Sequence, residues 1–122
     1  MKVVDSDIFI DFLRGVEEAK DFFINNAENI AFSAITEIEL LSGKICNEER
    51  EREKILFFLS KYTKIPIDNP MTILAGGLRR KFNIPFADSV IAATAISNEA
   101  TLITRNITDF KGIVEINLHK PY

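Results

Sequence analysis

Residues 3–13 read VVDSDIFIDFL: an apolar pair, an acid, and then apolar side chains at helical spacing. Val3 and Val4 predict a short buried strand that ends at Asp5. The apolar positions from Ile8 to Leu13 predict a helix that Gly15 closes. The chain therefore opens as strand, turn and helix, with an acid where strand and helix join.

The same alternation continues along the chain. Further helices are predicted over 16–26, 48–59, 70–81 and 87–96, and another along a stripe formed by Ala34, Ile38, Leu41 and Ile45. Strands are predicted at 30–32, 64–67, 101–104 and 114–116. Short apolar strands that alternate with helices predict an α/β fold, a three-layer α/β/α sandwich with a short, mostly parallel central sheet.

Composition sets the broad class. The 122 residues are 47% hydrophobic and 27% charged, which is typical of one domain spanning residues 1–122. No apolar stretch approaches the roughly 18 residues of a membrane span, and the N-terminus does not resemble a secretory signal. We therefore expect a cytoplasmic protein without membrane association. The single cysteine, Cys46, is expected to be buried and inert. The net charge of −3 argues against binding nucleic acid through a broad basic surface alone.

Acidic and amide side chains follow the predicted strands, lie in the first turn of a predicted helix or, for Glu39, lie about two turns into the helix after the second strand. In a parallel sheet, ligands bind beyond the carboxyl ends of the strands, so these positions are candidates for a site. Carboxylate oxygens are the ligands that Mg²⁺ and Mn²⁺ prefer, and such an ion activates water and neutralises charge on a phosphate. The candidates are Asp5, Glu39, Asp88, Asn106 and Asp109.

Four blocks of sequence carry a family resemblance. Val4–Ile10, Ser33–Gly43, Ala87–Ala95 and Leu102–Phe110 resemble, in this order, the four motifs of VapC-type toxins in the PIN domain family. The resemblance implies a PIN-like fold and a Mg²⁺- or Mn²⁺-dependent endoribonuclease that leaves 5′-phosphate and 3′-hydroxyl ends on its RNA substrate. It also implies a VapB-type antitoxin as partner and a homodimer.

The resemblance assigns roles to individual residues. The metal-binding acids fall on Asp5, Glu39 and Asp88, with Asn106 or Asp109 completing the catalytic site. Helical periodicity does not choose between Glu37 and Glu39, but the family pattern of Glu followed four residues later by Gly selects Glu39, with Gly43.

Two positions depart from the family pattern. Asp7 stands where the family usually has Asn, and we expect it to cap the following helix. Asn106 stands in place of a fourth acid; its amide oxygen can coordinate but brings no charge, which bears on a second metal more than on the first.

Adjacent aromatic pairs suggest surfaces for partners. Neighbours on a helix point in different directions, so Phe22 with Phe23 and Phe57 with Phe58 are not all expected in one core. The apolar surface left over would suit a dimer or an antitoxin.

Other functions remain open at this stage. Asp5-Ser6-Asp7 after a strand is also similar to the opening of haloacid-dehalogenase-like phosphohydrolases, but the later Lys and Gly-Asp-x-x-x-Asp blocks of that site are not evident. A phosphoacceptor receiver domain would need an Asp at the end of a central strand and a late Lys, and neither is evident. A PIN-like module that binds RNA or a partner without cutting is consistent with Asn106.

Overall fold

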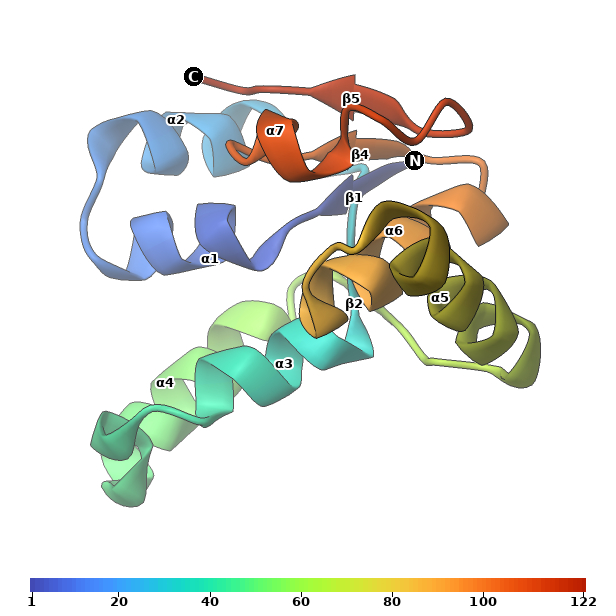
Figure 1. The fold of residues 1–122 in the computed structure, drawn as a ribbon. Coiled ribbons are helices and arrows are strands. Elements are labelled where there is room, and N and C mark those ends of the chain that lie inside the picture. The colour runs from blue at the N-terminus through green and yellow to red at the C-terminus, as the bar shows by residue number, and fades with distance from the viewer.

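The five strands form one sheet in which every neighbouring pair is parallel. The computed structural model describes all residues, 1–122, and orders the strands β3-β2-β1-β4-β5 (Figure 1). Their bounds are Lys2–Val4 (β1), Ile30–Ser33 (β2), Thr63–Ile65 (β3), Thr101–Ile103 (β4) and Asn117–His119 (β5). The predicted α/β class with a parallel sheet is confirmed.

Helices cover both faces of this sheet. They are α1 (Ser6–Leu13), α2 (Glu17–Asn25), α3 (Ala34–Leu41), α4 (Glu49–Leu59), α5 (Asn69–Phe82), α6 (Phe86–Ser97) and α7 (Ile107–Phe110), with a 3₁₀ turn η1 (Lys44–Asn47). Val3, Ala31 and Leu102 pack with side chains of α5 and α6 in one core. Val4, Phe32 and Ile103, one residue along each strand, pack with α1, α2 and α4 in the other. This alternation is the two-residue period of a strand buried on both faces, and it gives the predicted three-layer sandwich.

Helix α3 differs from the predicted stripe. Ile38 and Ile45 are 61% and 60% exposed, and the helix ends at Leu41. The helix spans the two cores, contributing Ile35 to one and Leu40 to the other, so a single apolar stripe does not describe its buried side. In Figure 1, α3 and α4 lie side by side and extend away from the sheet. Cys46 in η1 is buried, as predicted.

The last strand also lies elsewhere than predicted. Residues 114–116 form a turn in which Val114 is exposed, and the strand β5 follows at Asn117–His119. Ile113 and Ile116 anchor the turn in the core. The prediction was wrong because an edge strand needs a backbone partner on one side only, so the polar sequence Asn117-Leu118-His119 can pair with β4.

Only one of the two adjacent phenylalanine pairs is divided between the core and the surface. Phe22 and Phe23 are both buried, whereas Phe58 is buried and Phe57 is 68% exposed. Phe9 lies at the centre of the aromatic cluster, with ring centroids 5.1 Å from Phe23 and 5.8 Å from Phe58. None of the helices has the length and apolarity that crossing a membrane requires.

Candidate active site

The candidate site lies where the strand order reverses. β2 follows β1 on one side of the sheet and β4 lies on the other side of β1, so the crevice beyond these strands opens at this point. Val4 pairs with Ile103, and the Asp5 amide donates to the Ile103 carbonyl at 2.8 Å. Asp5 and Thr104 are therefore neighbours, and the Thr104 hydroxyl donates to Asp5 Oδ2 at 2.7 Å.

Asp5 is buried at the entrance to α1. It is the N-cap of that helix, and its Oδ1 accepts from the Ser6 amide at 2.7 Å. Burial raises the pKa of Asp5 to about 7, and the charges of Asp7 and Asp88 add to the rise, against the hydrogen bonds from Thr104 and Ser6. Its negative charge is therefore costly in the absence of a cation.

Asp7 does not have the predicted capping role. The cap of α1 is Asp5, and Asp7 lies in the first turn. Its Oδ2 accepts from the backbone amide of Arg105 at 3.0 Å, while its Oδ1 is buried without a hydrogen-bond partner. Burial raises the pKa of Asp7 as well.

Helix α3 brings Glu39 to the same end of the sheet. The Ser6 hydroxyl donates to Glu39 Oε1 at 2.6 Å, and the Thr36 hydroxyl lies 2.9 Å from the Ser6 hydroxyl oxygen. Glu37 instead pairs with Lys64 on β3 at 2.9 Å. The two glutamates that periodicity left equivalent thus have different surroundings, and Glu39 is the one whose charge reaches Asp88.

Asp88, Asn106 and Asp109 form the third part of the cluster. Asn106 Nδ2 donates to Asp109 Oδ2 at 2.7 Å and to Asp88 Oδ2 at 3.4 Å. Burial raises the pKa of Asp88 to about 7, with further contributions from Asp109, Glu39 and Asp7. Hydrogen bonds and charge interactions therefore connect all five candidate residues in one part of the molecule. We call Asp5, Asp7, Glu39, Asp88 and Asp109 the acidic cluster.

The sequence and the fold of this chain have known counterparts. The family model described as PIN domain matches residues 2–114. The chain belongs to the PIN domain family. The resemblance read from the four sequence blocks is thereby confirmed.

Curated relatives of this PIN domain cover almost its whole length. Ribonuclease VapC19 of Mycobacterium tuberculosis (strain ATCC 25618 / H37Rv) is 34% identical over 118 residues, which are 90% of this chain and 92% of the relative. Ribonuclease VapC2 of Rickettsia felis is 33% identical over 116 residues, which are 84% of this chain and 87% of the relative.

Solved structures share the fold. A toxin–antitoxin complex from Klebsiella pneumoniae contains a chain with a TM-score of 0.86 and 30% identity, covering 100% of this chain and 98% of its own. VapBC2 from Rickettsia felis, bound to a DNA fragment from its promoter, matches with a TM-score of 0.83 and 28% identity, covering 97% and 96%. These two structures therefore align with 97% to 100% of this chain.

The donors of this PIN domain fit a hard cation. As the side chains stand, no three His, Cys, Asp or Glu residues form a group that could hold a metal ion. Yet the cluster offers only oxygen donors, one of them the unpartnered Oδ1 of Asp7. The pKa values of Asp5 and Asp88 are raised first by burial and then by the neighbouring acids, and a bound cation would offset both effects. Side-chain rotations would have to bring the carboxylates together on one ion.

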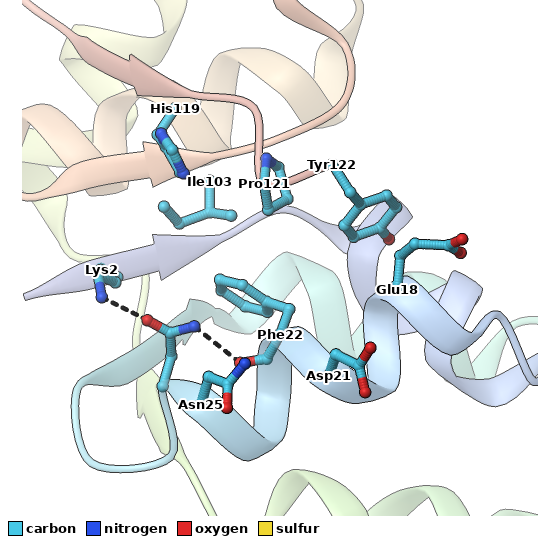
Figure 2. A pocket seen from close by; sticks show the side chains of 10 residues that line it. Lys2, Glu18, Asp21, Phe22, Asn25, Ile103, His119, Pro121 and Tyr122 are labelled. Carbon is cyan, nitrogen blue, oxygen red and sulfur yellow. Dashed lines mark hydrogen bonds between the residues drawn. The ribbon is translucent and has the colours of Figure 1, made fainter.

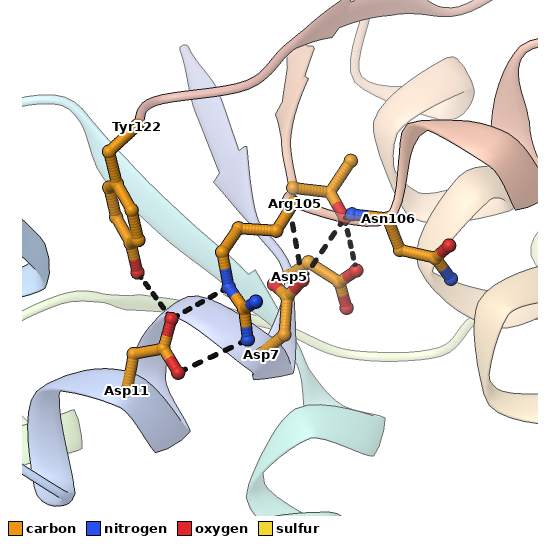
Figure 3. A network of polar contacts seen from close by, with 7 residues as sticks. Asp5, Asp7, Asp11, Arg105, Asn106 and Tyr122 are labelled. Atoms are coloured by element: carbon orange, nitrogen blue, oxygen red, sulfur yellow. Dashed lines mark hydrogen bonds and ion pairs between the residues drawn. The ribbon is translucent and has the colours of Figure 1, made fainter. Parts of the chain in front are cut away.

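Sequence reasoning missed one group of residues beside the cluster. The Arg105 guanidinium pairs with buried Asp11 on α1, and the Tyr122 hydroxyl donates to the same carboxylate (Figure 3). Asp11 lies four residues after Asp7, on the same helix face. That spacing was the available signal.

One groove borders the acidic cluster at Glu39, and a second cavity lies beside Tyr122. A groove of 580 Å³ between α1, α3 and α4 has Glu39 on its wall, together with the apolar side chains of Ile10, Leu13 and Ile45. A second cavity of 340 Å³ lies between Lys2, Phe22 and Tyr122 (Figure 2). No member of the acidic cluster lines the second cavity, so it is separate from the candidate site.

Proposed function

We propose that this chain is a VapC-type endoribonuclease that depends on Mg²⁺ or Mn²⁺ and is the toxin of a VapBC-type toxin–antitoxin pair. One observation carries the proposal: in a PIN domain, Asp5 directly follows β1, and Asp5, Asp88 and Glu39 lie close enough for the charge of Asp88 to act on Asp5 and that of Glu39 to act on Asp88. Relatives that carry the name Ribonuclease VapC support the reaction class.

The roles of the residues follow from their contacts. Asp5, Glu39 and Asp88 would hold the ion, which when bound supplies an acidified water and neutralises charge on the scissile phosphate. Thr104 and Ser6 orient the Asp5 and Glu39 carboxylates by donating hydrogen bonds to them.

Asn106 and Asp109 complete the proposed site. Asn106 Nδ2 links the Asp88 and Asp109 carboxylates and lowers the repulsion between them. Asp109, whose carboxylate lies beside that of Asp88, would help to orient the attacking water or accept its proton. Because water is the nucleophile, the RNA 2′-hydroxyl takes no part.

The partners in the proposal are RNA, a VapB-type antitoxin and a second copy of the chain. The groove beside Glu39 is lined by apolar side chains together with two acids, Glu39 and Glu51, and two bases, Arg14 and Lys54. This lining suits an amphipathic antitoxin segment. Ile38, Ile67 and Phe86 line a different apolar cavity of 400 Å³ and are all exposed, which suits a homodimer. We propose that residues 1–122 act as one domain in the cytoplasm.

The ends of the RNA products test the reaction. Purified protein is incubated with end-labelled structured RNAs and Mg²⁺ or Mn²⁺, and the ends are mapped by phosphatase and ligase treatment. We expect 5′-phosphate and 3′-hydroxyl ends. A 2′,3′-cyclic phosphate would overturn the water-attack mechanism, and folded, metal-loaded protein that cuts no RNA would favour a non-catalytic binding module.

A further inference from the structure

A buried acid outside the cluster links the end of α1 to the loop after β4. Asp11 is 7% exposed, and both of its carboxylate oxygens have partners. Arg105 Nε lies 2.7 Å from Oδ2, and Arg105 Nη2 donates to Oδ1 at 3.2 Å. The Tyr122 hydroxyl donates to Oδ2 at 2.7 Å. Figure 3 shows Arg105 and Tyr122 converging on this one side chain.

The two-point contact makes this pair more than a surface ion pair. Arginine presents a planar fork that matches a carboxylate, so such a pair fixes orientation as well as distance. The Arg105 side chain is 45% exposed and Asp11 is nearly buried, so the anchored end is on α1. Burial, followed by the hydrogen bond and charge of Asp11, raises the pKa of Tyr122, so its hydroxyl remains a donor at neutral pH.

Arg105 is the middle residue of a segment that holds the acidic cluster. Thr104 donates to Asp5 through its hydroxyl, and Arg105 donates to Asp7 through its backbone amide. Asn106 donates to Asp109 and Asp88 through its side chain. Three consecutive residues thus contact four of the five acids.

Few other contacts fix this segment. It connects the end of β4 at Ile103 to the start of α7 at Ile107, and Asn106 makes no side-chain cap to that helix. The Thr104 amide donates to the His119 carbonyl, which fixes the first residue only. Two contacts join the middle of the segment to α1: the Asp7 carboxylate accepts from the Arg105 amide, and the Arg105 guanidinium pairs with Asp11.

We propose that Asp11 and Tyr122 are positioning residues that hold Arg105, and through it the segment 104–106, in the place where that segment orients the acidic cluster. Neither residue touches the reacting atoms. For its effect on catalysis the inference rests on the proposed ribonuclease function; for the position of the segment it does not.

The variants Asp11→Asn and Tyr122→Phe test the inference, with Tyr62→Phe as control. Asparagine keeps the shape of Asp11 but cannot accept from both prongs of the guanidinium, and phenylalanine removes only the hydroxyl. Tyr62 packs among aromatic rings, so its variant makes the same chemical change away from Asp11.

Amide hydrogen exchange measures the position of the segment directly. In wild type, the Arg105 amide is bonded to Asp7 and the Asn106 amide to Thr104 Oγ1. We expect both amides to exchange on the order of tenfold faster in Asp11→Asn, and to a smaller extent in Tyr122→Phe, with α6 unchanged. The Tyr62→Phe control should exchange as wild type does.

Steady-state RNA cleavage supplies the second readout. We expect kcat to fall roughly 10-fold in Asp11→Asn while KM for RNA stays within about twofold, since the variant misplaces the acids rather than an RNA contact. The double variant should be no slower than Asp11→Asn, because both changes act through Arg105.

Each outcome of these two experiments supports or overturns the positioning role of Asp11 and Tyr122. Unchanged exchange at Arg105 and Asn106 overturns it whatever the activity, and faster exchange with wild-type kcat overturns the link to the site. If Asp11→Asn loosens the whole sheet, Tyr122→Phe decides by the same criteria. If wild-type protein cuts no RNA, the proposed function fails, while the exchange rates still decide whether Asp11 and Tyr122 position the segment.

Discussion

The Thr104 hydroxyl donates a hydrogen bond of 2.7 Å to the Asp5 carboxylate, although the two residues are 99 positions apart in the sequence. Parallel pairing of β1 with β4 makes them neighbours, because each is the first residue beyond its strand. The same geometry opens the crevice at the reversal of the strand order. Two acids of this PIN domain, Asp5 and Glu39, are therefore held by hydroxyl groups from neighbouring elements.

Removing these hydroxyl groups should weaken catalysis without unfolding the protein. Thr104→Val and Ser6→Ala delete the donors to Asp5 and Glu39, and partners of this kind contribute about 10–100-fold to activity or metal affinity. We expect losses in this range in RNA cleavage. Ser60→Ala is the control, because the exposed Ser60 hydroxyl bonds only within its own turn. Equal activity in all three variants would contradict the orienting role.

Substitution of the two glutamates of α3 should have very different effects on RNA cleavage. Glu39→Gln removes a charge from the acidic cluster, and we expect it to reduce cleavage by more than about 100-fold. Glu37→Gln breaks an ion pair with Lys64 whose side chain is half exposed, a change that costs less than about 1 kcal/mol in stability and leaves activity near wild type. If Glu37→Gln reduced RNA cleavage more than Glu39→Gln did, Glu37 and not Glu39 would belong to the site.

Stability should fall as pH rises in protein freed of metal by EDTA. The pKa values of Asp5 and Asp88 are raised from 3.8 to about 7 in the folded state, so between pH 4 and pH 7 the folded protein binds more protons than the unfolded chain. The free energy of unfolding therefore decreases through that window from these groups and levels off above it. Urea denaturation from pH 5 to pH 8 measures this decrease in the free energy of unfolding.

Divalent cations should reverse this trend. At pH 8 both carboxyls are ionised, so Mg²⁺ or Mn²⁺ should raise the midpoint of denaturation more at pH 8 than at pH 5. Asp5→Asn should flatten the pH dependence and reduce the effect of the cation. A cation effect equal at both pH values would argue against these carboxyls as ligands.

Asn106→Asp should supply the fourth acid of the family pattern and increase the repulsion within the acidic cluster. Without metal, the new carboxylate repels Asp88 and Asp109 in place of donating to them, so the denaturation midpoint should fall. With Mn²⁺, the added charge should tighten binding several-fold, as measured by titration. Weaker binding would mean that the amide of Asn106 is needed as a donor.

Much of the fold could be predicted because strands and helices differ in period. The buried strands β1, β2 and β4 and the apolar helix α6 were predicted close to their observed bounds. The bounds of α3 and β5 depend on contacts with distant parts of the chain. α3 divides its apolar residues between two cores, and β5 pairs at an edge where polar residues are tolerated.

The sequence predicted which residues are candidates for the site but not their contacts. Acids after strands, together with the family pattern, predicted Asp5, Glu39 and Asp88 as metal ligands. The exchange of roles between Asp5 and Asp7 was not predictable, because either acid could cap α1 by sequence. The convergence of Arg105 and Tyr122 on Asp11 joins residues 94 and 111 positions apart, and no local pattern encodes such contacts.

Cleavage of a labelled RNA by wild type and Asp88→Asn, in Mn²⁺ and in EDTA, tests the central claim most directly. Asp21→Asn is the control, since Asp21 is an exposed acid outside the cluster. We predict cutting by wild type and Asp21→Asn in Mn²⁺, none by any protein in EDTA, and at least about a 100-fold loss in Asp88→Asn. Cleavage that persists in EDTA, or in Asp88→Asn at the wild-type rate, would contradict a metal-dependent site built on these acids.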